Sequence, residues 1–365
     1  MLEGLRIIEI EALGPAPFAA MMLADLGADV IVVHRKHGRP APGMPERSVI
    51  DRGKRSIELD LKAPDDVAVL KQLVGRSGAL IEGFRPGVME RLGLGPDALM
   101  AVNPDLVYGR MTGWGQTGPR AQTASHDLNY VSLSGAAWYG GNAGEPPFTP
   151  PTLVGDIGGG ALYLVAGILS GVLAARAGRG GTVVDAAIVD GSAHMMNLLM
   201  ALGQTGGLAI ARGRSLLDGP HWSRCYACAD GGFMSVQCLE PKFYAAFLDL
   251  MGLSDDPDFT QQFDADAWPK QTALLAGLFA KQPRAHWEKL FEGSDACVAP
   301  ALDPRSSAAD PHMAARGVWR EIDGVFQAAP APRFSTGEER APRPLPARGD
   351  HTAEILSWLE SGHQT

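Results

Sequence analysis

Short apolar runs alternate with helix-like segments over the first 111 residues, and this alternation is the feature that most constrains the fold. The strands that we expect are 5–10, 30–33, 79–81 and 106–111, separated by helices at 15–26, 65–75 and 96–102. Strands that alternate with helices in this way build a parallel sheet, because each helix carries the chain back across the sheet. We predict an α/β fold with a doubly wound, Rossmann-like large domain that binds its ligands at the carboxyl ends of the strands.

The length of 365 residues exceeds that of one typical domain, so we expect two. A further strand is expected at 182–187 and a helix at about 192–202. A glycine-rich break at 203–213 then precedes a change to short strands and helices from Cys225 onward. We predict a large domain at 1–200, a linker at 201–224 and a small α+β domain at 225–310. Residues 311–365 are predicted to form a return connection, proline-rich over 328–348, and a C-terminal helix that packs on the large domain.

Charge and cysteine content limit the partners and the compartment. The net charge of -9 disfavours binding to nucleic acid or to an anionic membrane. Four cysteines are too few and too clustered to cross-link a chain of this length, so we expect free thiols and a reducing compartment. The first residues lack the order of a signal peptide, and the last four are not a peroxisomal signal. We therefore expect a cytoplasmic protein.

Residues 157–175 contain no charged side chain and are nearly long enough to span a bilayer. The segment is single, contains five glycines, and is bracketed by Asp156 and Arg176 without aromatic residues at either end. We interpret it as a core helix that packs closely through its glycines.

Two sequence motifs that mark ligand-binding sites in other proteins, G-x-G-x-x-G and C-x-x-C, occur here without the context that such sites need. Gly113-Trp114-Gly115-Gln116-Thr117-Gly118 matches the G-x-G-x-x-G loop of dinucleotide-binding proteins, but Pro119 follows and no helix begins there. We interpret it as a tight loop that lines a ligand, with a purely structural turn as the alternative. Cys225 and Cys228 have C-x-x-C spacing without a second well-spaced pair, so we expect no metal site. The sequence has neither a G-x-S-x-G nor a Walker A motif, which disfavours serine hydrolases and nucleotide-driven enzymes.

The most informative stretches are Ser125-His126-Asp127-Leu128-Asn129-Tyr130 and Gly155-Asp156-Ile157-Gly158-Gly159-Gly160. Each alone is ambiguous, since a histidine beside an aspartate is an ordinary surface turn and an aspartate before a helix is an ordinary N-cap. With further motifs, however, the chain resembles the family III CoA-transferases and, through the loop at 125–127, their branch of α-methylacyl-CoA racemases. The resemblance covers most of the chain, at 13–20, 23–30, 55–62, 82–88, 91–95, 111–119, 155–160, 184–187 and 239–244.

This resemblance implies a racemase that interconverts R and S 2-methylacyl-CoA thioesters through an enolate. The residues that match His126 and Asp156 are the two proton-transfer groups of such racemases, and the one that matches Glu240 supports the histidine. Asp127 matches the aspartate that forms an acyl anhydride in the transferase branch. The resemblance also implies an interlocked homodimer in which Glu240 serves His126 of the opposite subunit.

Coenzyme A carries phosphates, so we expect basic side chains around it. The predicted CoA-binding set is Arg85, Arg91, Arg52, Lys54, Arg55 and Tyr130. Arg85 and Arg91 rank first because they belong to matched motifs, and a solvated rim is the alternative for the basic residues. No separate cofactor is expected, since CoA is part of the substrate.

A proton beside a thioester is weakly acidic, so the enolate oxygen must be stabilised. We expect donors among the backbone amides around Asp127 and in the glycine-lined pocket. Two alternative functions are a CoA-transferase that uses Asp127 as nucleophile and an inactive family member that only binds acyl-CoA or a partner protein. The presence of His126, Asp156 and Glu240 argues against the inactive protein. Residues 221–224 depart from the tyrosine-rich sequence expected there, which leaves the acyl-chain selectivity open.

Overall fold

A computed structural model describes residues 1–40, 45–322, 324–336 and 344–361. The predicted proline-rich connection and the C-terminal end lie partly outside these residues, at 337–343 and 362–365. The chain divides into two compact units. The large unit comprises Met1–Ala136, Pro150–Met195 and Gly317–Thr365, and the small unit comprises Ala137–Thr149 and Met196–Arg316.

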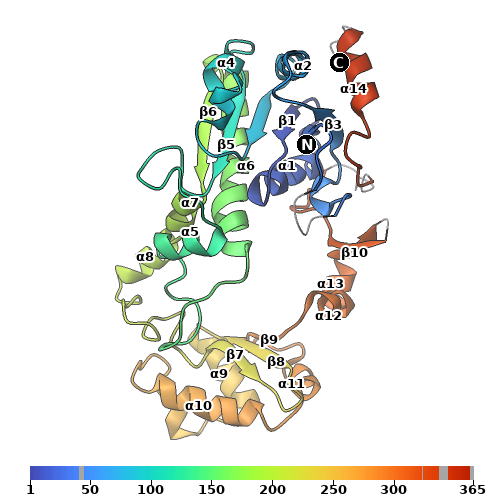
Figure 1. Ribbon diagram of the computed structural model, residues 1–365. Coiled ribbons are helices and arrows are strands. Elements are labelled where there is room, and N and C mark those ends of the chain that lie inside the picture. The colour runs from blue at the N-terminus through green and yellow to red at the C-terminus, as the bar shows by residue number, and fades with distance from the viewer. Residues whose placement is uncertain (41–44, 323, 337–343, 362–365) are drawn as a thin grey trace. The chain divides into compact units, whose positions relative to one another are not determined.

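A six-stranded parallel sheet forms the centre of the large unit, in the order β3-β2-β1-β4-β5-β6 (Figure 1). The predicted α/β fold with a parallel sheet is therefore confirmed. The central strands are nearly continuous apolar runs because helices cover both faces of a parallel sheet. The strands are β1 (Arg6–Ile10), β2 (Asp29–Arg35), β3 (Arg55–Leu59), β4 (Ala79–Glu82), β5 (Val107–Thr112) and β6 (Thr182–Ala187).

Proline at the first helical position begins several of the connecting helices, where its missing N–H costs no hydrogen bond. The helices of the large unit are α1 (Pro15–Asp25), α2 (Pro64–Val74), α3 (Val88–Arg91), α4 (Pro96–Met100), α5 (Asp127–Ser134), α6 (Leu162–Ala174), α7 (Ile188–Met195) and α14 (Thr352–Glu360), with 3-10 or π turns η1 (Val49–Asp51), η2 (Leu153–Ala161) and η3 (Ala175–Arg179). A two-stranded antiparallel sheet, β10 (Trp319–Ile322) and β11 (Val325–Ala328), belongs to the same unit.

Helix α6 lies directly on the sheet because its glycines leave no side chain in between. A Cβ atom added to Gly167 would lie 2.5 Å from Val184 of β6, and one added to Gly171 would lie 2.7 Å from Val107 of β5. The predicted close packing through glycines is confirmed. Within the described residues, one helical stretch, Leu153–Arg179, is long and apolar enough to cross a membrane, a property that core helices of soluble proteins share.

The C-terminal helix α14 packs beside α2 and β3, as expected from the sequence (Figure 1). Trp358 lies under the guanidinium of Arg6, 4.1 Å from the ring centroid, and Arg76 donates to the carbonyl groups of Trp358 and Leu359. The C-terminus of a helix favours such cations, because its last carbonyl groups lack partners within the helix.

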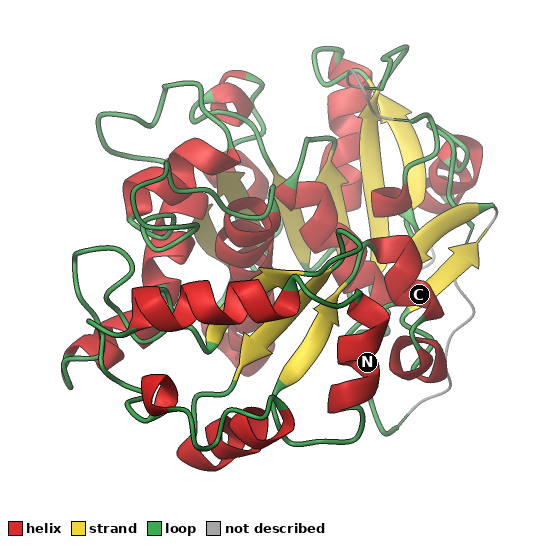
Figure 2. Cartoon of the chain, turned by 90° about the horizontal axis from the view of Figure 1, so that it is seen from below, coloured by secondary structure: helices red, strands yellow, loops and turns green. Residues whose placement is uncertain are grey.

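The small unit contains a three-stranded antiparallel sheet with helices beside it (Figure 2). Its elements are α8 (Asn197–Gly203), β7 (Ser223–Ala227), β8 (Phe233–Gln237), α9 (Pro241–Leu250), η4 (Pro257–Phe259), α10 (Trp268–Phe279), α11 (Arg284–Phe291), β9 (Val298–Ala301), α12 (Pro304–Ala309) and α13 (Pro311–Ala315). All four cysteines are free, and the described residues contain no group of side chains able to hold a metal ion.

The boundaries differ from the prediction in three places. Residues 137–149 belong to the small unit, although they lie within the range 1–200 predicted for the large domain and the chain returns to the large unit at Pro150. The predicted linker at 201–224 is part of the small unit, where His221 and Trp222 are fully buried and His221 Nε2 lies 2.7 Å from the Tyr244 hydroxyl. The predicted helix near 192–202 is divided into α7 and α8 at the boundary between the units.

Candidate active site

A cavity of about 660 Å³ opens at the carboxyl ends of β1, β2, β4 and β5 in the large unit. This is where the strand order predicts a ligand, because the chain leaves β1 and β4 toward opposite sides of the sheet. The cavity brings together four of the residues predicted from the sequence: His126, Asp156, Tyr130 and Arg85.

His126 is the N-cap residue of α5 and has an extended backbone. Its backbone N–H donates to Asn129 Oδ1 at 3.2 Å, which fixes the start of the helix and leaves the imidazole exposed beside the cavity. The N–H groups of Asp127 and Leu128 in the first turn donate to no atom of the described residues. Such free N–H groups, together with the helix dipole, favour a negative charge at this helix end.

Asp156 lies in the π-helical turn η2, half-buried and next to Gly14. A Cβ atom on Gly14, whose φ is 70°, would lie 3.4 Å from Asp156 Oδ2, so the turn before α1 needs glycine for its backbone. Burial, with a further contribution from the charge of Asp127, raises the pKa of Asp156 to about 6, although His126 opposes the shift. A carboxyl group with this pKa can both accept and donate a proton near neutral pH.

Asp127 does not line the cavity, and its carboxylate holds the segment that carries Asp156. Its Oδ1 atom accepts a hydrogen bond from the backbone N–H of Asp156 at 2.8 Å, and Oδ2 accepts one from Thr152 at 3.3 Å. A Cβ atom on Gly155 would lie 2.3 Å from Asp127 Oδ1, so glycine is required for this approach. Asp127 thus links the first turn of α5 to η2.

The glycine-rich loop at 113–118 contributes its first two residues, Gly113 and Trp114, to the cavity wall, and no helix begins at its end. A Cβ atom on Gly113 would lie 1.9 Å from the Tyr130 ring, and Trp114 packs edge-on against the same ring at 4.7 Å. Tyr130 donates its hydroxyl hydrogen to the Ser125 carbonyl at 2.5 Å. Its buried ring therefore shapes the loop before His126, and its hydroxyl group already has a partner.

The predicted basic residues separate into two groups. Arg85 lines the cavity, but Arg91, an exposed residue of α3, does not. Arg35 and Arg39, which are not in the predicted set, also line the cavity, close to the end of β2. Arg35 lies two residues beyond the strand predicted at 30–33, and this position near the carboxyl end of a parallel strand was the signal that could have pointed to it.

The other three predicted CoA ligands, Arg52, Lys54 and Arg55, each form an ion pair within the large unit. Lys54 has a fully buried side chain whose Nζ lies 2.6 Å from Glu9 Oε2, and Arg52 pairs with Asp25 at 2.6 Å. Arg55 pairs with Asp29 at 2.6 Å. None of the three lines this cavity or its neighbour.

A second cavity of about 310 Å³ adjoins the first, and the two share Glu11, Arg35 and Phe84 in their walls. Its wall is mainly apolar and includes Leu59 and Leu61, with Lys62 at the edge. Lys62 lies in a motif that the sequence analysis matched to the family but did not assign.

Glu240 belongs to the small unit, where it is exposed and forms the N-cap of α9 before Pro241. Its carboxylate makes no capping hydrogen bond. Its predicted support of His126 stays a prediction.

The large unit places an imidazole, His126, and a carboxyl group, Asp156, on one cavity with a basic rim. An imidazole and a carboxyl group can exchange protons with a carbon atom held between them if nearby donors stabilise the resulting oxyanion.

Comparison with known proteins shows the family to which the chain is similar. The model of CoA-transferase family III matches residues 2–352. The chain is 38% identical to alpha-methylacyl-CoA racemase of Mus musculus over 98% of this chain and 92% of the relative. It is also 38% identical to the Homo sapiens alpha-methylacyl-CoA racemase over 97% of this chain and 92% of the relative. A CAIB/BAIF family protein from Brucella suis has a similar crystal structure, with a TM-score of 0.81 and 26% identity over 98% of both chains.

Proposed function

The chain belongs to CoA-transferase family III, and from this premise we propose that it is a 2-methylacyl-CoA racemase. It is an isomerase that interconverts R and S 2-methylacyl-CoA thioesters by removing and returning the α-proton. The observation that carries this function is the presence of His126 and Asp156 on one cavity, since inversion needs a base on one face of the α-carbon and an acid on the other.

In this mechanism one of the two residues removes the α-proton and the other protonates the opposite face of the enolate. We expect the free N–H groups of Asp127 and Leu128 to stabilise the enolate oxygen, because they directly follow the cavity residue His126 and have no acceptor among the described residues. The chain thus supplies both proton carriers, and we propose that the reaction needs no separate cofactor. The four free cysteines favour a reducing compartment such as the cytoplasm.

We further propose that the CoA part lies along the two adjoining cavities. Arg85, Arg35 and Arg39 give the large cavity a basic rim for phosphates, and the apolar wall of the smaller cavity suits a flat base.

The alternative, a CoA-transferase with Asp127 as nucleophile, fits the geometry less well. Both carboxylate oxygens of Asp127 accept backbone hydrogen bonds from the segment with Asp156, and its side chain does not line the cavity. A nucleophile must reach the thioester carbon. We therefore assign Asp127 to holding Asp156 in place.

Deuterium incorporation tests the function. In deuterated water without any added carboxylic acid, the protein is expected to introduce solvent deuterium at the α-carbon of either enantiomer of a 2-methylacyl-CoA and to lead to the same mixture from both. Mass spectrometry with chiral chromatography measures both changes. An unexchanged α-hydrogen, with transfer of CoA to an added acid, would show that the protein is a transferase.

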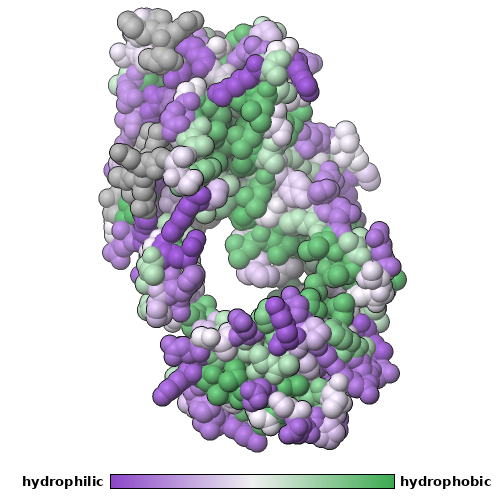
Figure 3. Space-filling model, turned by 180° about the vertical axis from the view of Figure 1, so that it is seen from behind, coloured by the Kyte–Doolittle hydropathy of each residue, from purple (hydrophilic) through white to green (hydrophobic). Residues whose placement is uncertain are grey.

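We propose a homodimer in which Glu240 approaches His126 of the other subunit. Figure 3 shows apolar side chains on parts of the surface. Leu173 of α6 in the large unit is 68% exposed, and Leu198 of α8 in the small unit is 72% exposed. Large exposed apolar areas are typical of interfaces. Sedimentation is expected to give twice the chain mass of 38.6 kDa, and a fully active species at the single-chain mass would exclude this arrangement.

A further inference from the structure

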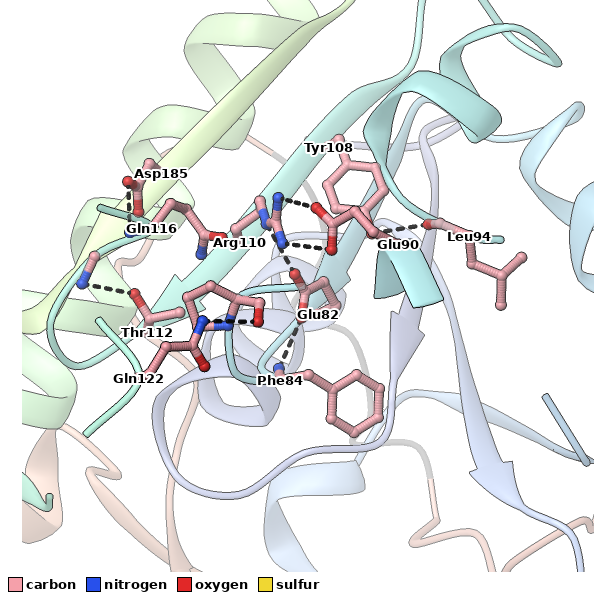
Figure 4. Close-up of polar contacts among 12 residues, drawn as sticks. Glu82, Phe84, Glu90, Leu94, Tyr108, Arg110, Thr112, Gln116, Gln122 and Asp185 are labelled. Carbon is pink, nitrogen blue, oxygen red and sulfur yellow. Dashed lines mark hydrogen bonds and ion pairs between the residues drawn. The ribbon is translucent and has the colours of Figure 1, made fainter. Parts of the chain in front are cut away.

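The segment between β4 and α3 carries Arg85 to the cavity, and a group of charged side chains, Glu82, Arg110 and Glu90, holds both of its ends (Figure 4). Glu82, the last residue of β4, is 1% exposed. One of its carboxylate oxygens accepts the backbone N–H of Phe84 at 2.7 Å, and the other accepts Arg110 Nε at 3.1 Å. Glu82 therefore fixes the first turn after the strand.

Arg110 of β5 reaches from this turn to its far end. Its Nη1 and Nη2 atoms donate to the two carboxylate oxygens of Glu90, in α3, at 2.7 and 3.3 Å. Such a forked pair fixes orientation as well as distance. One guanidinium thus sets the separation between Glu82 and Glu90, the two residues that flank the turn at 84–87.

Neighbouring contacts hold Arg110 itself and the middle of the turn. Arg110 and Glu82 are register partners in the ladder between β5 and β4. Tyr108 donates its hydroxyl hydrogen to the Leu94 carbonyl at 3.0 Å and lies beside the Arg110 guanidinium. Gln122, in the loop that leads to His126, donates to the Pro86 carbonyl at 3.1 Å.

The position of this group excludes direct chemistry. Burial raises the pKa of Glu82 to about 7, a value typical of catalytic bases. However, neither Glu82 nor Arg110 lines the cavity, and both oxygens of Glu82 have hydrogen-bond donors. Arg85, in contrast, lines the cavity, and its guanidinium forms no hydrogen bond or ion pair with the described residues.

We propose that Arg110, together with Glu82 and Glu90, is a set of positioning residues that holds the turn at 84–87 so that Arg85 meets the phosphates of the CoA thioester. The inference rests on the proposed function for the identity of the ligand. It predicts that these residues change CoA affinity only through Arg85.

The test measures the dissociation constant of CoA by calorimetry, in five variants of the full-length protein. Arg85→Ala is expected to weaken CoA binding by about tenfold or more, since it removes a charge-assisted contact. Glu90→Ala is expected to weaken CoA binding by about three- to tenfold, a change typical of the coupling between residues of one hydrogen-bond network. The value of kcat should change little, because Glu90 does not touch the reacting atoms. The Glu90 side chain is 44% exposed, so this variant should fold. Arg110→Lys should resemble Glu90→Ala, because lysine keeps the charge but not the fork.

A double variant shows whether Glu90 affects CoA affinity only through Arg85. In the Arg85→Ala background, Glu90→Ala should have no further effect on CoA affinity. The matched control is Glu354→Ala, which removes a comparable exposed ion pair with Arg55 at 3.1 Å and should leave CoA affinity unchanged. The proposal is wrong if Glu90→Ala has no effect, if its effect persists without Arg85, or if Arg85→Ala leaves CoA affinity intact. Failure of the proposed function would appear differently, as normal CoA binding without deuterium exchange.

Discussion

Replacement of Asp156 by asparagine is expected to lower the rate of racemisation by about 10²- to 10⁴-fold, the usual contribution of a general acid or base. The amide matches the carboxyl group in size but cannot exchange a proton with the α-carbon. Chiral chromatography of a 2-methylacyl-CoA measures the rate. His126→Ala should cause a loss of the same order, because inversion needs both residues. Asp105→Asn, an exposed aspartate of the same unit, is the control. A variant at Asp156 that retained most of the activity would exclude the two-residue mechanism.

The same variant should also change the pH dependence of stability. Asp156 has its pKa raised to about 6 by burial, above its ordinary value of 3.8, so the fold disfavours its charged form. The resulting loss of folding stability is absent below pH 3.8, where the carboxyl group is protonated, and is complete above about pH 6, where it is charged. Asp156→Asn should therefore raise the urea midpoint relative to the native protein at pH 8, and the gain should disappear as the pH falls to 4. A gain that is equal at both pH values would show that the carboxylate is not destabilised by its site.

Replacement of Lys54 by methionine is expected to lower the free energy of unfolding by about 3 to 5 kcal/mol, as for the loss of one partner from a buried ion pair. Lys54 Nζ lies between Glu9 Oε2 at 2.6 Å, Asp51 Oδ1 at 3.3 Å and the Pro17 carbonyl at 3.1 Å. Glu9 is 1% exposed and would be left without its cation. Urea unfolding measures the loss.

A second change separates stability from binding. Glu9→Gln combined with Lys54→Met should recover much of the lost stability, because no unpaired carboxylate then remains in the core. The CoA affinity of the folded single variant should equal that of the native protein. If Lys54→Met were instead as stable as the native protein and bound CoA weakly, Lys54 would be a ligand, as the sequence alone suggested.

The strands and helices of the large unit were largely predictable, because buried parallel strands are continuous apolar runs and proline marks helix starts. The strand Thr182–Ala187 was predicted with its observed limits. The strand Arg55–Leu59 was missed, since Arg55 and Glu58 interrupt its apolar residues and Ser56 uses its hydroxyl group for His34 and Gly349. The division of the helix near Met196 was also missed, because it lies at a boundary between units that only the packing defines.

The sequence by itself determined the α/β fold, through local apolar patterns, and the resemblance to the family, through its motifs. That resemblance led to the proposed roles of His126 and Asp156. The tertiary structure decided which basic residues are free to meet a ligand. Arg52 and Lys54 have the same charge as Arg85, but their partners Asp25 and Glu9 are distant in sequence and come close only when α1 and the strands assemble. Burial and pairing are properties of the packed chain, so no local pattern could have separated these residues from Arg85.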